Sequence, residues 1–287
     1  MTTGVVCLGK KVRWLAVLGM GLVTACDGGT EAGATKSNEG SVVMARSGLE
    51  EVGWGPDFIV TDVTAPAAAY PYATFTATVT VCNQGTAGGE ASVGLFLSAD
   101  ADVSTADRQF GGDFLGLLEP GQCATREVSG WLEAPSEEPF YLGAIADPED
   151  WRPEVDESNN TSVHGLLGIG VEADFIVTDV TAPASARPGE TFTASVTVCN
   201  QGTAPGHTDV ELTLAASPEE PAGQTLAGAY IGWIDMGQCA TQAVFVSPGF
   251  VDEGTWYLRA ITNRGGFHPE LIHSNNERVS NAFLLQY

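Results

Sequence analysis

One loop of this chain concentrates oxygen ligands of the kind that bind calcium. Residues 147–160 read Asp-Pro-Glu-Asp-Trp-Arg-Pro-Glu-Val-Asp-Glu-Ser-Asn-Asn and contain six carboxylates. Ca²⁺ takes six to eight oxygen ligands, so the supply is sufficient, although the spacing matches no EF-hand loop and lacks the glycine that such a loop needs. The ligands that we predict for Ca²⁺ are Asp147, Glu154, Asp156, Glu157 and Asn159.

The same loop has a second interpretation, in which it serves the fold. Here Asn159 and Asn160 cap the turn by bonding backbone amides, and the acids lie in solvent. A second copy of the loop, 116 residues further on, keeps Glu270, Asn275 and Asn276. It loses acids, because Asn263, Ile272 and His273 stand where the first copy has Asp147, Asp156 and Glu157. Residues kept in both copies therefore favour a structural role, and the extra acids are candidates for function.

Two further features of the loops bear on binding. Trp151 lies within the acidic loop and Phe267 stands at its place in the second copy, so an aromatic recurs there. Trp151 either contacts a ligand such as a sugar or anchors the loop by hydrophobic packing. A second acidic segment, Asp100–Asp107, is typical of turns in which aspartate side chains bond the backbone.

The chain has no recognisable catalytic motif. It contains no Gly-x-Ser-x-Gly elbow, no His-Glu-x-x-His pair and no Walker loop. Of its four histidines only His268 and His273 are close in sequence, without cysteines or carboxylates spaced for zinc, and we expect surface imidazoles. We predict a protein that is not an enzyme and has no cofactor, with Ca²⁺ as the one ion to consider.

Cysteines mark an internal repeat. Val-Thr-Val-Cys-Asn-Gln-Gly-Thr-Ala occurs at 79–87 and 196–204, and Gly-Gln-Cys-Ala-Thr at 121–125 and 237–241. Four cysteines allow three pairings. Only one bridge per repeat treats both copies alike, which predicts the disulfides Cys82–Cys123 and Cys199–Cys239. Disulfides are typical of exported proteins.

The N-terminal segment predicts export and anchoring. Three basic residues, Lys10, Lys11 and Arg13, precede an apolar run at 14–25 that is too short to span a bilayer. The run ends in Leu-Val-Thr-Ala-Cys at 22–26, which resembles a bacterial lipobox. That resemblance implies a lipoprotein signal peptide at 1–25 and lipidation of Cys26; an ordinary signal peptide is the alternative. Residues 26–55, rich in small and polar residues, predict a flexible tether.

The charge limits the partners. From Cys26 onward the chain has nine basic residues against 36 acidic ones, a formal charge of −27. Such a surface repels nucleic acid and anionic lipid headgroups. We therefore predict no nucleic-acid partner, and membrane contact through the lipid anchor only. The expected location is the cell envelope, in the inner or the outer membrane.

The elements that carry these loops read as β-strands. Phe75, Ala77, Val79 and Val81 alternate with threonines, the pattern of a half-buried antiparallel strand. We predict strands at 58–63, 74–81, 92–97, 124–128 and 140–146 and a seven-stranded sandwich per repeat, at 56–169 and 170–287. Residue parity places Cys82 and Cys123 on the polar face, so that each disulfide joins neighbouring strands of one sheet.

These motifs support a family resemblance. The opening Pro-Asp-Phe-Ile-Val, the Val-Cys-Asn-Gln-Gly turn, the Phe-Leu-Ser-x-Asp segment and the closing Pro-Glu-Val-Asp-Glu-Ser-Asn-Asn resemble CARDB, the cell-adhesion-related domain found in bacteria. The resemblance implies an all-β chain of two tandem immunoglobulin-like sandwiches. It also implies a non-catalytic interaction or adhesion module for an envelope protein or a polysaccharide. The alternative function is a calcium-stabilised structural spacer.

Overall fold

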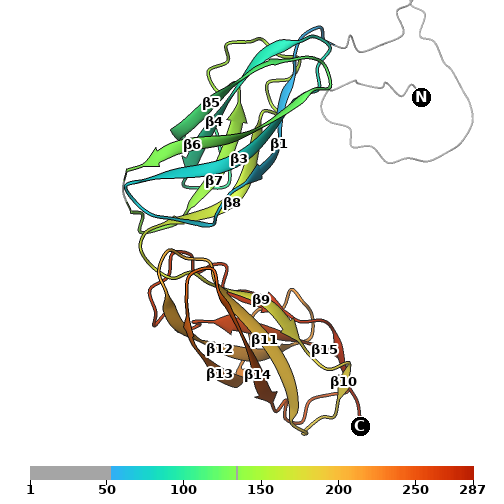
Figure 1. The fold of residues 1–287 in the computed structure, drawn as a ribbon. Helices are drawn as coiled ribbons and strands as arrows, with labels where there is room; N and C mark the ends of the chain where they lie inside the picture. Colours follow the sequence, from blue (N-terminus) through green and yellow to red (C-terminus); the bar gives the residue numbers. More distant parts are fainter. Residues whose placement is uncertain (1–52, 134) are drawn as a thin grey trace, which may run out of the picture. The chain divides into compact units, whose positions relative to one another are not determined.

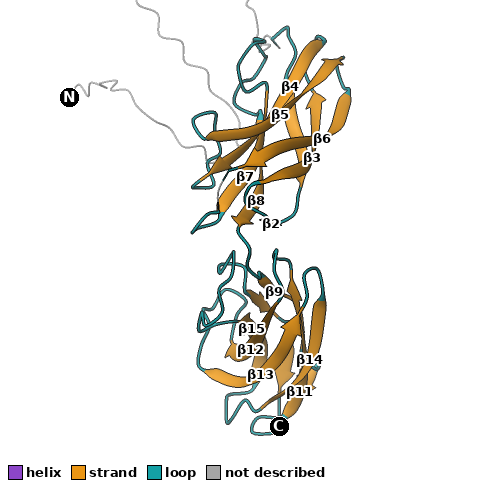
Figure 2. Cartoon of the chain, turned by 60° about the vertical axis from the view of Figure 1, so that its left-hand side comes forward, coloured by secondary structure: helices purple, strands orange, loops and turns teal. Residues whose placement is uncertain are grey.

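A computed structural model describes residues 53–133 and 135–287 of the chain, which form two β-sandwiches (Figure 1, Figure 2). The predicted signal peptide, Cys26 and most of the predicted tether lie outside the described residues. The end of that tether belongs to the first sandwich, because the N–H of Thr86 donates to the carbonyl of Gly55 over 2.8 Å. In the part of the chain that is described, no helix is long and apolar enough to cross a membrane.

The first sandwich contains eight strands, one of which has only two residues. They are β1 (Phe58–Thr64), β2 (Ala68–Ala69), β3 (Ala73–Asn83), β4 (Gly89–Ser98), β5 (Arg108–Leu118), β6 (Cys123–Leu132), β7 (Phe140–Ala146) and β8 (Thr161–Ile169). One layer has the order β1-β3-β6 and the other β5-β4-β7-β8. All five predicted strands are present. Strands β2, β5 and β8 were not predicted; in β5, three glycines interrupt the apolar alternation.

The second sandwich repeats this plan. Its strands are β9 (Phe175–Thr181), β10 (Ser185–Ala186), β11 (Phe192–Asn200), β12 (Gly206–Ala215), β13 (Thr225–Ile234), β14 (Cys239–Val246), β15 (Gly254–Thr262), β16 (Glu277–Val279) and β17 (Phe283–Leu285). One layer is β9-β11-β14, and the other runs β13-β12-β15-β17, with β16 also on β15. The tandem all-β architecture expected from the sequence is confirmed, although the two sandwiches have eight and nine strands rather than the seven predicted for each.

The two copies differ at one corner. In the first sandwich a single bridge between Gly111 and Gly130 joins the two layers. A Cβ on Gly130 would lie 2.3 Å from the carbonyl oxygen of Phe110, so only glycine allows this approach. In the second sandwich Val246 occupies the position of Gly130, and the two layers stay separate.

The core follows the predicted alternation. On β3 the apolar residues Phe75, Ala77, Val79 and Val81 are buried, whereas the threonines between them are exposed or half-buried. Each fully buried valine or phenylalanine side chain contributes about 1.5–3 kcal/mol through removal of apolar surface from water. Both sandwiches therefore have a hydrophobic core of their own.

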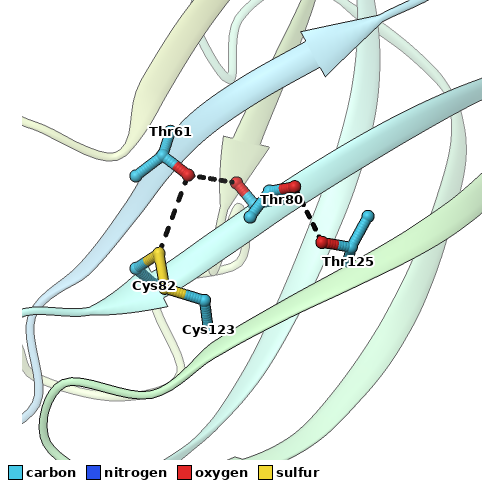
Figure 3. Close-up of a disulfide and its surroundings, with 5 residues drawn as sticks. All are labelled: Thr61, Thr80, Cys82, Cys123 and Thr125. Atoms are coloured by element: carbon cyan, nitrogen blue, oxygen red, sulfur yellow. Dashed lines mark hydrogen bonds between the residues drawn. A yellow bond between two sulfur atoms is a disulfide. The ribbon is translucent and has the colours of Figure 1, made fainter.

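Both predicted disulfides are present, Cys82–Cys123 and Cys199–Cys239. In each pair the cysteines face each other on neighbouring antiparallel strands of one layer. Figure 3 shows the first bridge beside a row of threonines on the outer face, where the hydroxyls of Thr80 and Thr125 lie 2.9 Å apart. The prediction that the bridge staples the polar face of one sheet is confirmed.

Candidate functional site

A buried asparagine organises the end of the first sandwich from which the acidic loop projects. The Asn83 side chain has no exposed surface. Its Nδ2 donates to the carbonyls of Ala87 and Leu118, each over 2.8 Å. Its Oδ1 accepts the N–H of Asp57 over 3.1 Å and that of Gly85 over 2.9 Å. One side chain thus satisfies four backbone groups at this end of the sandwich.

The second sandwich has the same arrangement around Asn200. Its Nδ2 donates to Ala204 and Ile234, and its Oδ1 accepts from Asp174 and Gly202, at 2.9–3.2 Å. Asparagine in the repeated Cys-Asn-Gln-Gly segment is therefore explained by backbone satisfaction. This part of the motif is structural in both copies.

The closing motif fastens the acidic loop to the first strand. In the first sandwich the carboxylate of Glu154 accepts the N–H of Phe58 and, over 3.1 Å, the Nδ2 of Asn160. Asn159 donates to the Asp57 carboxylate over 2.9 Å. The expectation that both asparagines bond the backbone holds for Asn160, whose Nδ2 donates to the carbonyl of Ala146 over 3.3 Å. Asn159 bonds a carboxylate instead. Both use their amide nitrogens as donors, because carboxylates and a carbonyl surround them.

The second sandwich shows that this fastening is structural. Glu270 accepts from Phe175 N–H over 2.9 Å and from Asn276 over 3.1 Å, and Asn275 donates to Asp174 over 3.0 Å. In both copies the Oδ1 of each asparagine in the closing pair is buried without a partner. Since the second copy lacks most of the acids, these unpaired oxygens belong to the turn and do not by themselves mark a cation site.

The five predicted calcium ligands do not converge on one point. Asp156 accepts from the backbone and hydroxyl of Ser158, which lowers the pKa of its carboxyl, and Asn159 is bonded to Asp57. Asp147 and Glu157 line a separate cavity of about 310 Å³ together with Asp150, which was not predicted. Among the described residues, no group of three or more His, Cys, Asp or Glu side chains is placed to hold a metal ion. The calcium set therefore does not fit this geometry.

One difference between the two loops changes a carboxyl group's acidity. Asp147 and its counterpart Asn263 both adopt a left-handed backbone, with φ of 42° and 45°, which Asp and Asn tolerate better than most residues. The Nδ2 of Asn263 donates to Glu270. Asp147 has no such proton to give, and instead its negative charge faces Glu154. Burial first, and then the charges of Glu157 and Asp147, raise the pKa of Glu154 from 4.5 to about 7.

This raised pKa predicts a pH-dependent stability. Between pH 4.5 and 7 the folded state binds a proton on Glu154 that the unfolded state has lost, so stability falls as pH rises through 7. Asp147→Asn restores the donor of the second sandwich and is expected to reduce this fall. Because Glu154 is half exposed, solvent screening limits the gain to at most about 1 kcal/mol at pH 8, about 4 °C in Tm, with no gain at pH 4.5. Thermal unfolding at both pH values, with EDTA present, measures it.

Asp150→Asn provides the matched control. Asp150 also has a left-handed backbone, with φ of 51°, and carries the same charge in the same loop, but it is not a cause of the shift at Glu154. Its substitution should leave the pH profile of the melting temperature unchanged. An Asp147→Asn profile that coincides with that of Asp150→Asn would contradict the assignment.

Trp151 projects into solvent. It is 77% exposed, so the prediction that it anchors the loop by packing is wrong. The loop is instead held by the bonds of Asn159 and Asn160 described above. Trp151 lines a cavity of about 440 Å³ together with Phe114 of β5, which is 60% exposed. Polar groups in the lining come from Ser92, Gln109, Asp113 and Glu149.

The second sandwich exposes aromatic residues at the equivalent places. Phe267, the counterpart of Trp151, is 84% exposed, and Tyr230, the counterpart of Phe114, is 67% exposed. Exposed aromatic side chains therefore recur at the same two places in both sandwiches. Sequence reasoning missed Phe114 and Tyr230, because both lie on strands that the alternation did not reveal or resolve.

The remaining predicted features have plain roles. The Asp102 N–H donates to the Asp100 side chain over 3.0 Å, and the Ser104 N–H donates to Asp107 over 2.8 Å. The latter bond lowers the pKa of Asp107. The turn-forming role predicted for this segment is confirmed. The prediction of surface imidazoles is wrong for His164, which is half-buried and bonded to the carbonyls of Val63 and Ala65.

The fold and these exposed loops define a tandem β-sandwich protein of the immunoglobulin-like kind. The CARDB family model matches residues 55–164 and 172–280, more than half of the chain. The chain therefore belongs to the CARDB family. No curated protein matches it.

Solved structures that match include the CARDB domain of the PF1109 protein from Pyrococcus furiosus, in complex with di-metal ions. It has 17% identity and a TM-score of 0.32, over 41% of this chain and 96% of that one. A solution structure of the same domain covers 42% of this chain and 100% of that one, with 17% identity and a TM-score of 0.33. The match to the calcium binding domain CBD12 of CALX1.1 covers 71% of this chain and 80% of that one, with 12% identity and a TM-score of 0.28.

Proposed function

We propose that this chain is a non-catalytic binding protein of the cell envelope, anchored through a lipid on Cys26, whose first sandwich binds a neutral polysaccharide at Trp151 and Phe114. The observation that carries the proposal is the pair of exposed aromatic rings lining one cavity of about 440 Å³. Family membership supports an adhesion-related extracellular module. The two disulfides support an exported protein.

The lining of the cavity suits a sugar. Sugar rings have apolar C–H faces that stack on aromatic rings, and their hydroxyl groups need hydrogen-bond partners at the edges. Gln109 offers an amide that both donates and accepts, and Asp113 and Glu149 offer carboxylates that accept from hydroxyls. An apolar wall with a few polar groups is the usual composition of a small-molecule site.

The charge of the chain selects among polysaccharides. With a formal charge of −27 after the predicted cleavage, the surface repels sulfated or uronic-acid polymers. Two carboxylates in the cavity itself add to this repulsion locally. A neutral chain of hexoses meets no such penalty, so we favour it over an anionic one.

Trp151→Ala is the sharpest test of this site. Removing the exposed ring should weaken glycan binding by about 2 kcal/mol, roughly 30-fold, as for other aromatic residues at the centre of an interface. A glycan array identifies the ligand, and isothermal titration then compares the variant with the unmodified chain. Because Trp151 is exposed, the melting temperature should not change.

Trp131→Ala is the matched control, since Trp131 is 55% exposed on β6 and does not line the cavity. Its glycan affinity should equal that of the unmodified chain. Equal affinity of the Trp151→Ala variant would refute the site. Capture of an envelope protein through Trp151, without glycan binding, would replace polysaccharide by protein as the partner.

The alternative function, a calcium-stabilised spacer, has one observation in its favour. Asp147, Asp150 and Glu157 line the cavity of about 310 Å³ where the second sandwich has Asn263, Gly266 and His273. A spacer of this kind requires Ca²⁺ to raise the melting temperature. Titration of Ca²⁺ with neither heat nor thermal shift would remove it.

A further inference from the structure

Two histidines that are far apart in the sequence meet in the second sandwich. His207 lies near the start of β12, and His268 lies in the loop after β15. Their ring centres are 4.2 Å apart, with an angle of 67° between the ring planes. Trp233 of β13 lies beside His207, with its ring centre 6.1 Å away and the planes inclined by 14°. The sequence indicated a different pair, His268 and His273.

Both histidines are held by their backbones and leave their rings free. On β12, His207 is in register with Trp233 of β13. In the loop, the side chain of Asn263 clamps His268: Asn263 Nδ2 donates to the His268 carbonyl over 2.8 Å, and the His268 N–H donates to Asn263 Oδ1 over 3.2 Å. Within residues 53–133 and 135–287, no hydrogen bond reaches a ring nitrogen of either histidine.

The first sandwich shows what this position does without imidazoles. The counterparts of His207 and His268 are Glu90 and Arg152, which form an ion pair. That pair joins the two side chains through one contact, between the Arg152 guanidinium and the Glu90 carboxylate. In the second sandwich the carboxylate and the guanidinium are both absent, and two imidazole rings stand in their place. An ion pair that links β4 to the loop after β7 is thus replaced by two rings, each of which has a nitrogen with a free electron pair when it is neutral.

We propose that His207 and His268 bind a divalent transition-metal ion, of the Zn²⁺ and Cu²⁺ class. Neutral imidazole nitrogen is the commonest protein ligand for these ions. An ion about 2.0–2.1 Å from one nitrogen of each ring places the ring centres about 4.5–5.2 Å apart. The observed distance of 4.2 Å lies about 0.3 Å below this range, so binding requires the exposed His207 ring to move slightly.

Water completes the coordination. The cavity beside the two rings has a volume of about 220 Å³, which leaves room for water ligands. Only two strong ligands are fixed, since the described residues contain no cluster of three or more His, Cys, Asp or Glu side chains placed to hold a metal. The site is therefore open to solvent, and free coordination positions remain for a ligand atom from another molecule.

Titration of metal ions into the untagged full chain tests the proposal. After treatment with EDTA and dialysis, isothermal titration with ZnCl₂ or CuCl₂ should show one ion per chain. His207→Gln and His268→Gln should each weaken binding at least about tenfold, and His164→Gln and His273→Gln should not. With Cu²⁺, the electron paramagnetic resonance spectrum should show two coupled nitrogens and lose this coupling in either of the first two variants.

A double variant keeps the test decisive even if a single one disturbs the loop. His207→Glu with His268→Arg installs the ion pair of the first sandwich, so the fold should persist while the ion is lost. Binding that survives in this double variant, or Ca²⁺ that competes as well as Zn²⁺, would show that the acidic surface holds the ion and would overturn the proposal. The proposal is independent of glycan binding at Trp151, so each can fail without the other.

Discussion

Replacement of Asn83 by alanine is expected to lower the free energy of unfolding of the first sandwich by about 3–5 kcal/mol. The variant leaves four backbone groups without their partner, those of Asp57, Gly85, Ala87 and Leu118. Because Asn83 has no exposed surface, water reaches these groups only by opening the turn. At about 4 °C per kcal/mol, the transition should move down by roughly 12–20 °C in differential scanning calorimetry.

Gln84→Ala is the control for this prediction. Gln84 is the next residue and makes one side-chain bond, to Asp57 over 3.1 Å, from an exposed position. Its loss should cost about 0.5–1 kcal/mol. The equivalent variant Asn200→Ala should shift the transition of the second sandwich by the amount that Asn83→Ala shifts that of the first. If Asn83→Ala lowered the free energy of unfolding no more than Gln84→Ala does, the buried Asn83 amide would not be what stabilises the turn.

Loss of the Cys82–Cys123 disulfide should have an effect of similar size. The bridge closes a loop with a sequence separation of 41 residues. In the chain-entropy model such a bridge stabilises the fold by about 4 kcal/mol, because it restricts the unfolded chain. The Cys82→Ala, Cys123→Ala double variant should therefore melt roughly 16 °C lower in its first sandwich only. Reduction of the unmodified chain should lower both transitions, since the second bridge spans 40 residues.

The threonine pair beside the bridge supplies the control. Thr80 and Thr125 face each other across the same two strands, two residues from the cysteines, and their hydroxyls are 2.9 Å apart (Figure 3). Replacing both with alanine removes an exposed cross-strand contact worth about 0.2–1 kcal/mol. If the disulfide variant had the same melting temperature as this threonine variant, the backbone hydrogen bonds between β3 and β6 would suffice to hold the two strands together without the disulfide.

Much of the fold could be predicted from local patterns. Alternation of period two in 74–81 identified β3, because a strand with one buried face must alternate apolar and polar residues. The same parity placed Cys82 on the outer face, and the duplication selected its partner. Strand β5 escaped prediction, because its glycines serve a corner where two layers approach closely, and that contact involves a residue of another strand.

The candidate sites were less predictable. The acids of residues 147–160 suggested one calcium site, but the fold sends Asp156 and Asn159 to different hydrogen bonds. Trp151 was identified, whereas its partner Phe114 lies 37 positions away, on a strand that had not been predicted. A site assembled from separate strands and loops leaves no local spacing to detect.

The sequence by itself determined the duplication, the disulfide pairing, the β class and the family, because each depends on residue type and short-range order along the chain. Tertiary structure alone decided which side chains share a cavity. The contact of His207 with His268, where the first copy has Glu90 and Arg152, depends on strand register and on the path of a loop that places His268 61 residues further on. Register is set by burial over whole strands, so a distant pair of this kind becomes visible only once the sandwich is folded.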